Sequence, residues 1–244
     1  MKSKIYEAFV IGATVSACAI AAHYKNSAIV IENDMIAGDD FGSVYNITYE
    51  NGGIDGEERA FVKRVKEKLP EGCVSHALWL SDLIITDLAE SGAKLLLCTS
   101  AADVVSENGL YRVRLFGTCG FSDILTKRVF DTTAQGAVRL CAGSMKYKKT
   151  LCAALYRKSD GSFRRIMTEA AADYVSARRS LLEQMKSETA DGFELAAISP
   201  VFMYSFEKKI CVVNNERYIV SPSVSYGSID AAYNGGIECA LAIC

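Results

Sequence analysis

Apolar runs and one helix-like segment alternate at the start of the chain. The run Tyr6–Ile11 predicts a strand, Gly12 a tight turn, and the alanine-rich stretch Val15–Tyr24 a helix. A second, β-branched run, Ser27–Ile31, predicts another strand and is followed directly by Glu32. Strand, turn, helix and strand in this order predict a βαβ unit with two parallel strands.

Helical and strand patterns continue to alternate downstream. Apolar positions at helical spacing predict a charged surface helix over Glu57–Lys68 and an apolar helix over Val74–Ser91, with Gly92 at its C-cap. Asn108-Gly109 has the composition of a tight hairpin turn. The strands predicted for this part of the chain are Ala93–Thr99, Ala102–Ser106, Leu110–Phe116 and Val129–Ala134.

The pattern changes after residue 141. The elements predicted here are a strand over Tyr147–Arg157, a long helix over Thr168–Lys186, and strands over Phe193–Phe206 and Lys209–Val213. This part of the chain contains no glycine loop. A final strand, Arg217–Val220, leads to a closing apolar helix. Residues 141–213 are therefore predicted to form a small α+β lobe inserted into a larger α/β domain, which consists of residues 1–140 and 214–244.

Composition narrows the class of protein. The chain has 244 residues, of which 50% are hydrophobic and 23% charged, so it can form one large domain or two small ones and is too apolar to be disordered. A formal net charge of −2 argues against a nucleic-acid binder that neutralises phosphates. No run of about 20 apolar residues predicts a membrane span.

The number and placement of the cysteines indicate the redox environment of the protein. The nine cysteines are odd in number, are scattered, and form no C-x-x-C pair. Most lie within apolar or small-residue runs, where cysteine behaves as a small hydrophobic residue, so a reducing, cytoplasmic location is predicted. The two histidines, His23 and His76, are too far apart in sequence to suggest a zinc site, and no metal is predicted.

The N-terminus has a second interpretation. Lys2 and Lys4 before the apolar run Ala8–Ala22 are typical of a secretory signal, and Val15-Ser16-Ala17-Cys18 is similar to a lipoprotein cleavage site. The second strand and its terminal Glu32 favour the βαβ unit. A secreted or lipid-anchored protein with a cleaved N-terminus stays an alternative.

Spacing within the βαβ unit indicates dinucleotide binding. Glu32 follows Gly12 by 20 residues, the spacing at which a carboxylate reaches a ribose hydroxyl. The pattern G-x-G-x-x-G/A is here Gly12-Ala13-Thr14-Val15-Ser16-Ala17. Thr14 replaces the middle glycine and adds a side chain where the backbone approaches a pyrophosphate. The sequence leaves open whether its hydroxyl donates a hydrogen bond or its methyl group obstructs.

The order of elements resembles the FAD-dependent oxidoreductases with the glutathione-reductase-type nucleotide-binding fold. The segments that carry the likeness are AIVIE, the helix end Glu90-Ser91-Gly92, LLLCTSAADVV, VFDTTAQG, ARRSLLEQMKSETADGFELA and SYGSIDAAYNGGIECALA. The resemblance implies a three-layer, Rossmann-like FAD/NAD(P)-binding domain, with residues 141–213 as a small substrate or cap lobe. This chain departs from the pattern at Thr14 and at Ala134, which stands where a glycine is expected, and it is short after Pro200.

The resemblance also implies a path for FAD. Gly12, Ala13, Thr14, Val15 and Ser16 would face the pyrophosphate at a helix N-terminus, where backbone amides favour anions. Glu32 would hold the adenosine ribose. The further positions implied are Asp39 and Asp40 on the loop near the ribose, Ala101 at the adenine, Thr132 and Thr133 on the second side, and Gly227, Ile229, Gly235 and Gly236 near the flavin.

Two functions are weighed besides the secreted alternative. The first is an FAD-dependent oxidoreductase that acts on a small-molecule substrate, with the flavin carrying the hydride chemistry. The second is a non-catalytic, degenerate FAD-fold subunit or binding protein, which Thr14 and the short lobe favour. The sequence identifies no catalytic residue and leaves open whether the protein forms homo- or hetero-oligomers.

Overall fold

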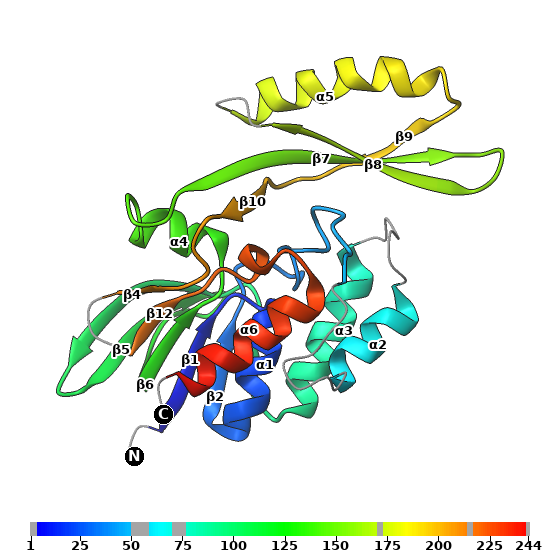
Figure 1. Ribbon diagram of the computed structural model, residues 1–244. Coiled ribbons are helices and arrows are strands. Elements are labelled where there is room, and N and C mark those ends of the chain that lie inside the picture. The colour runs from blue at the N-terminus through cyan, green and yellow to red at the C-terminus, as the bar shows by residue number, and fades with distance from the viewer. Residues whose placement is uncertain (1–3, 50–58, 70–76, 170–172, 214–216, 243–244) are drawn as a thin grey trace.

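A large mixed sheet forms the body of the molecule in the computed structural model, which describes residues 4–49, 59–69, 77–169, 173–213 and 217–242. Its strand order is β11-β12-β6-β1-β2-β3, and β4 and β5 continue from β6 as an antiparallel meander (Figure 1). The strands are β1 (Ile5–Ile11), β2 (Ala28–Ile31), β3 (Lys94–Leu96), β4 (Ser100–Glu107), β5 (Leu110–Gly117), β6 (Gly120–Asp131), β11 (Cys211–Val212) and β12 (Tyr218–Val220).

Three layers follow from the alternation of side chains along the parallel strands. Ala8, Val10 and Val30 belong to the apolar core that the sheet shares with the helices on one face, while Phe9 and Ile29 pack with the meander on the other. These layers confirm the predicted α/β class. The helices on the first face are α1 (Val15–Tyr24), α2 (Ala60–Lys68), α3 (Ala77–Glu90) and α6 (Ile229–Leu241), and α4 (Ala134–Leu140) lies on the second.

Helix α6 packs closely against α1 and against Tyr226 because two of its glycines lack side chains. A Cβ on Gly236 would lie 2.3 Å from the carbonyl oxygen of Ser16, and one on Gly235 would lie 2.1 Å from the ring of Tyr226. Ser16 also donates its hydroxyl hydrogen to the carbonyl of Ala232 at 2.8 Å. The N-terminus of α1 is thereby held against the C-terminal part of the chain.

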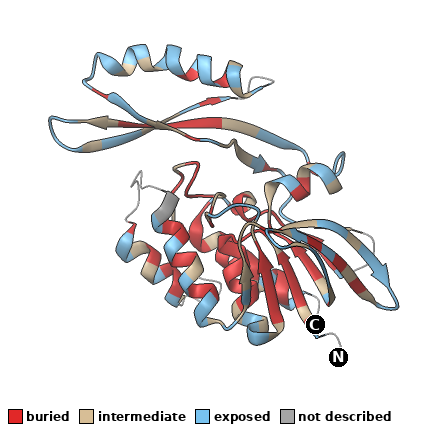
Figure 2. Cartoon of the chain, turned by 180° about the vertical axis from the view of Figure 1, so that it is seen from behind, coloured by how far each residue is buried: buried red, intermediate tan, exposed pale blue. Residues whose placement is uncertain are grey.

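A second, four-stranded sheet forms a small lobe. Its strands are β7 (Tyr147–Arg157), β8 (Ser162–Glu169), β9 (Glu194–Ile198) and β10 (Met203–Phe206), and helix α5 (Tyr174–Thr189) covers one face. The cluster beneath α5 is small and is built on Leu151, Ala153, Ala177 and Leu181. Most of α5 is exposed to solvent, as Figure 2 shows.

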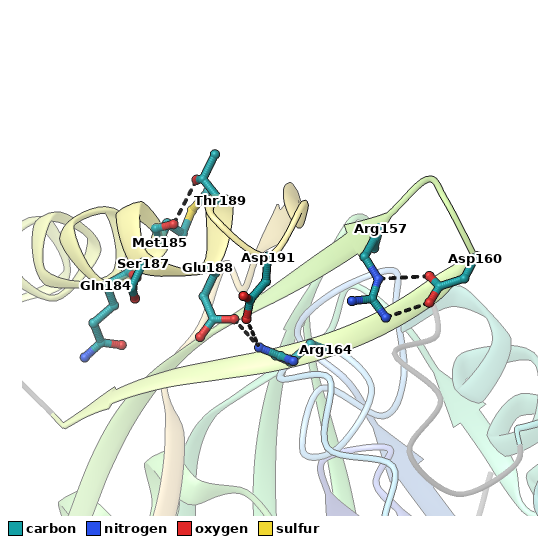
Figure 3. Close-up of polar contacts among 9 residues, drawn as sticks. All are labelled: Arg157, Asp160, Arg164, Gln184, Met185, Ser187, Glu188, Thr189 and Asp191. Atoms are coloured by element: carbon teal, nitrogen blue, oxygen red, sulfur yellow. Dashed lines mark hydrogen bonds and ion pairs between the residues drawn. The ribbon is translucent and has the colours of Figure 1, made fainter.

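Polar contacts fasten one end of this lobe (Figure 3). Arg164 of β8 pairs with Glu188 at the end of α5 and lies 3.6 Å from a carboxylate oxygen of Asp191. The guanidinium groups of Arg164 and Arg157 lie 4.4 and 4.7 Å from the ring centroid of Phe193, which is buried between them. These contacts tie the C-terminal end of α5 to the β7–β8 hairpin.

Several predicted boundaries are wrong. The helix predicted from Thr168 begins at Tyr174, because Thr168 and Glu169 belong to β8 and pair with β7. Asp173 caps the helix by accepting from the Ser176 amide at 2.9 Å. The strand predicted over Val129–Ala134 begins at Gly120 and ends at Asp131. The starts predicted at Glu57 and Val74 lie outside the described residues.

Other strands are shorter than predicted. Ala93–Thr99 contains a strand only at β3, because the chain bends after Leu96, where Cys98 has a positive φ of 51°. The Thr99 amide then donates to the Glu32 carbonyl at 2.8 Å. Phe193–Phe206 is divided into β9 and β10 around Ser199, whose amide donates to the Cys152 carbonyl at 2.9 Å. Over the described residues no helix combines the length and apolarity needed to cross a bilayer, and no His, Cys, Asp and Glu cluster is suited to hold a metal ion.

Candidate functional site

The carboxyl ends of β1, β2, β6 and β12 meet at the N-terminus of α1, the edge at which α/β sheets bind ligands. Gly12 turns the chain from β1 into α1 with a φ of +91°, which side chains rarely permit. Its amide donates to the Ile31 carbonyl at 2.9 Å. A Cβ at this position would lie 2.6 Å from the methyl group of Thr133, so the turn requires glycine.

Thr14 uses its hydroxyl within the protein. The oxygen caps α1 by accepting from the Ala17 amide at 3.2 Å, and the hydroxyl donates to that of Thr132 at 2.8 Å. The Thr132 hydroxyl in turn lies 3.0 Å from the carbonyl of Ile11, to which it donates. Thr14 therefore links the β1–α1 turn to the loop after β6, and its hydroxyl is committed to these contacts.

Three amides at the start of α1 donate to side-chain oxygens of the protein itself. The Ala13 amide donates to Glu32 Oε2 at 2.8 Å, and the Val15 amide donates to Asp40 Oδ2 at 3.3 Å. The Ser16 amide donates to Ser223 Oγ at 3.2 Å. A helix N-terminus attracts anions through its unpaired amides and its dipole. Here two carboxylates occupy that position.

Burial makes both carboxylates costly to ionise. It raises the pKa of Glu32 to about 7, although hydrogen bonds from the Ala13 and Asp34 amides lower it. Burial likewise raises the pKa of Asp40 to about 6, against hydrogen bonds from Ser223 and Val15. Asp40 Oδ1 is shielded from solvent and has no hydrogen-bond partner in the described part of the chain. Both carboxylates thus titrate close to neutral pH.

The loop that carries Asp40 is anchored. The Gly38 amide donates to the Ala13 carbonyl at 2.9 Å, and Phe41 is fully buried in the core beside the helices. Asp39 faces its own loop, where it accepts from the hydroxyl of Ser43. Asp40 is therefore held at the α1 N-terminus by its neighbours in sequence.

Thr133 and Asp131 stabilise the next turn. Thr133 caps α4 by accepting from the Gly136 amide at 3.0 Å, and its own amide and hydroxyl donate to Asp131 Oδ1 at 3.0 and 2.6 Å. A Cβ on Gly136 would lie 1.9 Å from the Asp131 carboxylate. Burial raises the pKa of Asp131 to about 6. These groups stabilise the turn after β6, on which Thr132 lies.

The remaining predicted positions are spread around the sheet edge. Ala101 lies on β4, two residues after Thr99, which contacts Glu32, and Ile229 is the buried first residue of α6. Gly227 has a φ of +82° and its carbonyl accepts from Thr48 Oγ1 at 2.9 Å. The structure brings residues 12–16, Glu32, Asp40 and Thr132 together, whereas Gly235 and Gly236 have the packing roles described above.

Sequence reasoning missed Ser223. It follows β12, a strand parallel to β6, and its amide donates to the Thr132 carbonyl at 2.9 Å. The signal was a serine three residues beyond an apolar strand that ends at the same edge as Gly12. Only the placement of β12 beside β6, which is remote in sequence, identifies it.

The residues around α1 suit the adenosine ribose of FAD better than its pyrophosphate. Glu32 stands at the end of β2, the position from which a carboxylate reaches a ribose. A pyrophosphate needs free amides at the α1 N-terminus, and those of Ala13, Val15 and Ser16 already donate to protein oxygens. As they stand, these residues do not fit the pyrophosphate of FAD.

No family model matches the sequence, and no curated protein matches it. Solved structures match along nearly the whole chain. A flavoprotein/dehydrogenase from Cytophaga hutchinsonii has a TM-score of 0.68 at 10% identity and covers 98% of this chain and 78% of its own. A geranylgeranyl bacteriochlorophyll reductase-like protein from Thermoplasma acidophilum has a TM-score of 0.67 at 10% identity, over 99% of this chain and 78% of its own.

A third similar structure is a ternary complex of aklavinone-11 hydroxylase with FAD and aklavinone. It has a TM-score of 0.60 at 12% identity and covers 99% of this chain and 62% of its own. Identities this low establish the fold alone. The chain has the three-layer, Rossmann-like α/β fold found in these structures.

Proposed function

We propose that the protein is an FAD-dependent oxidoreductase that acts on a small-molecule substrate. The observation that supports this best is the glycine turn at Gly12 with Glu32 beside it at the carboxyl edge of the sheet, in a fold that similar solved structures, a flavoprotein/dehydrogenase among them, share over 98–99% of this chain. Residues 1–140 and 214–244 would form the FAD-binding domain, and residues 141–213 the lobe that faces the substrate.

The small lobe supports this division of roles. Arg165 of β8 donates to the carbonyl of Tyr45 at 3.3 Å and also contacts the side-chain oxygen of Asn46. The loop that carries Asp40 at α1 therefore also contacts the lobe. A substrate bound under the lobe would lie close to the carboxyl edge of the large sheet, where ligands of such folds bind.

A second candidate is a non-catalytic FAD-fold subunit or binding protein. The observation that favours it is the occupation of the α1 amides by Glu32, Asp40 and Ser223. In that case the fold would be kept as a scaffold, and its phosphate site would be filled by the protein's own oxygens.

Flavin absorbance separates the two candidates. Purified protein is titrated with FAD, and the visible bands of the oxidised flavin are followed, with FMN as the control because FMN lacks the adenosine that Glu32 would hold. A band shift that saturates with FAD and is weaker with FMN supports the oxidoreductase. Bleaching of the bound flavin by candidate reductants then screens for substrates. Absence of any shift at high FAD, in folded protein, favours the non-catalytic candidate.

A further inference from the structure

We propose that Asp40 is a built-in competitor for the phosphates of a dinucleotide, so that the ligand binds only when Asp40 leaves the α1 N-terminus. The inference rests on the proposed function, since it concerns the same site. It goes further, because Asp40, which the resemblance places on the loop near the ribose, would oppose cofactor binding instead of supporting it.

The contact geometry is that of an anion at a helix N-terminus. Asp40 Oδ2 accepts from the Val15 amide at 3.3 Å, and the Ser223 hydroxyl lies beside the same carboxylate. A phosphate bound at α1 would take its hydrogen bonds from these same amides. One donor cannot serve a carboxylate and a phosphate equally well, so the two anions exclude each other.

Charge adds to the exclusion. Asp39 is the charged neighbour that opposes ionisation of Asp40, and the other groups that face it are the Val15 amide, the Ser223 hydroxyl and the thiol of Cys18. No lysine or arginine in the described part of the chain hydrogen-bonds to Asp40. A pyrophosphate placed against this carboxylate would meet an uncompensated like charge.

The loop holds Asp40 firmly in this position. Phe41 is buried in the core, Gly38 is bonded to Ala13, and the amide of Gly42 donates to the carbonyl of Gly38 at 2.8 Å. Arg165 of the lobe holds the far end of the loop. Because both flanks are fixed, displacing Asp40 requires the loop or its side chain to rearrange, and that requirement weakens dinucleotide binding.

The test compares Asp40→Ala with the wild type in the full chain. The probes are FAD, followed by quenching of its fluorescence, and ADP, followed by calorimetry, because ADP contains the adenosine and pyrophosphate without the flavin. Asp34→Ala is the matched control, an exposed aspartate of the same loop whose own amide, and not its carboxylate, contacts Glu32. Asp40→Asn serves as a second variant of unchanged shape.

We expect Asp40→Ala to bind both probes at least about tenfold more tightly than the wild type, with Asp34→Ala within about twofold of it. Equal affinity of the wild type and both Asp40 variants for FAD would overturn the inference and leave the proposed function standing. Failure of every folded variant to bind either probe would overturn both, because the opened site would still reject the dinucleotide. Circular dichroism checks that each variant is folded.

Discussion

The α1 N-terminus and the small lobe use charged residues in opposite ways. At α1, Glu32 and Asp40 point inward at backbone amides, and burial raises the pKa of each carboxyl. On the lobe, Arg157 pairs with Asp160 at the surface at 2.6 Å, and this guanidinium holds the pKa of Asp160 below its usual range. The carboxylates at α1 are desolvated, whereas the charges on the lobe stay hydrated.

This difference distinguishes charges that stabilise the fold from charges that belong to a candidate site. Surface ion pairs contribute little to stability and are easily replaced, so the charges of the lobe are explained by its fold alone. Buried carboxylates without a paired cation cost free energy and persist where they serve a site. The α1 N-terminus is therefore the candidate site, whereas the ion pairs at the end of the lobe hold its elements together.

The largest expected effect is on the core of the lobe. Leu181→Ala should destabilise the lobe by about 3 kcal/mol, because the side chain is fully buried in a small cluster that cannot compensate for the cavity. Hydrogen exchange should accelerate along α5 and β7 while β1 and α1 keep their protection. Leu182→Ala, whose side chain is 41% exposed, is the control and should change little. Equal acceleration in β1 would show that the two sheets unfold as one unit.

The next effect is a pH dependence of stability to which Asp40 contributes. The pKa of Asp40 rises from 3.8 to about 6 on folding, so the folded state binds the proton more tightly than the unfolded state. The stability that this proton provides is fully present below the ordinary pKa and is lost as the pH rises through about 6. The wild type should therefore lose stability between about pH 4 and pH 7.

Asp40→Asn should remove about 2 kcal/mol of that loss, measured by urea unfolding at both pH values. Glu32, Asp39, Asp87 and Asp131, whose pKa values are also raised by burial, contribute to the part that remains. Asp34→Asn controls for the simple loss of a carboxylate from the loop. An unchanged pH dependence in Asp40→Asn would mean that Asp40 is not desolvated in the folded protein.

Sequence patterns predicted the βαβ unit of the large sheet well and its polar contacts poorly. Gly12, the run Val15–Tyr24 and the second strand have local signals, so the βαβ unit and the α/β class follow from periodicity and turn chemistry. The hydrogen bond from Val15 to Asp40 joins residues 25 apart, and that from Ser16 to Ser223 joins residues 207 apart. No local pattern encodes such pairings.

Glycines illustrate the same limit. Gly235 and Gly236 were expected at the flavin, yet their missing side chains already have a reason in the packing of α6 against Tyr226 and α1. A glycine in sequence signals close approach without saying what approaches. The helix start predicted at Thr168 was wrong for a similar cause, because β8 is defined by its pairing with β7 over Ser162–Glu169, and its residues do not alternate cleanly between apolar and polar.

The smallest expected effect concerns the ion pair between Arg164 and Glu188 on the lobe. Arg164 is 44% exposed and pairs with Glu188, so a double-mutant cycle of Arg164→Ala and Glu188→Ala should give a coupling below about 1 kcal/mol. Arg164→Ala alone should cost slightly more than the coupling, because it also removes the guanidinium from the face of Phe193. High salt should reduce the coupling and leave the contact with Phe193 largely unchanged. A coupling of several kcal/mol would mean that this pair is buried in solution and that the lobe, like the α1 site, contains desolvated charge.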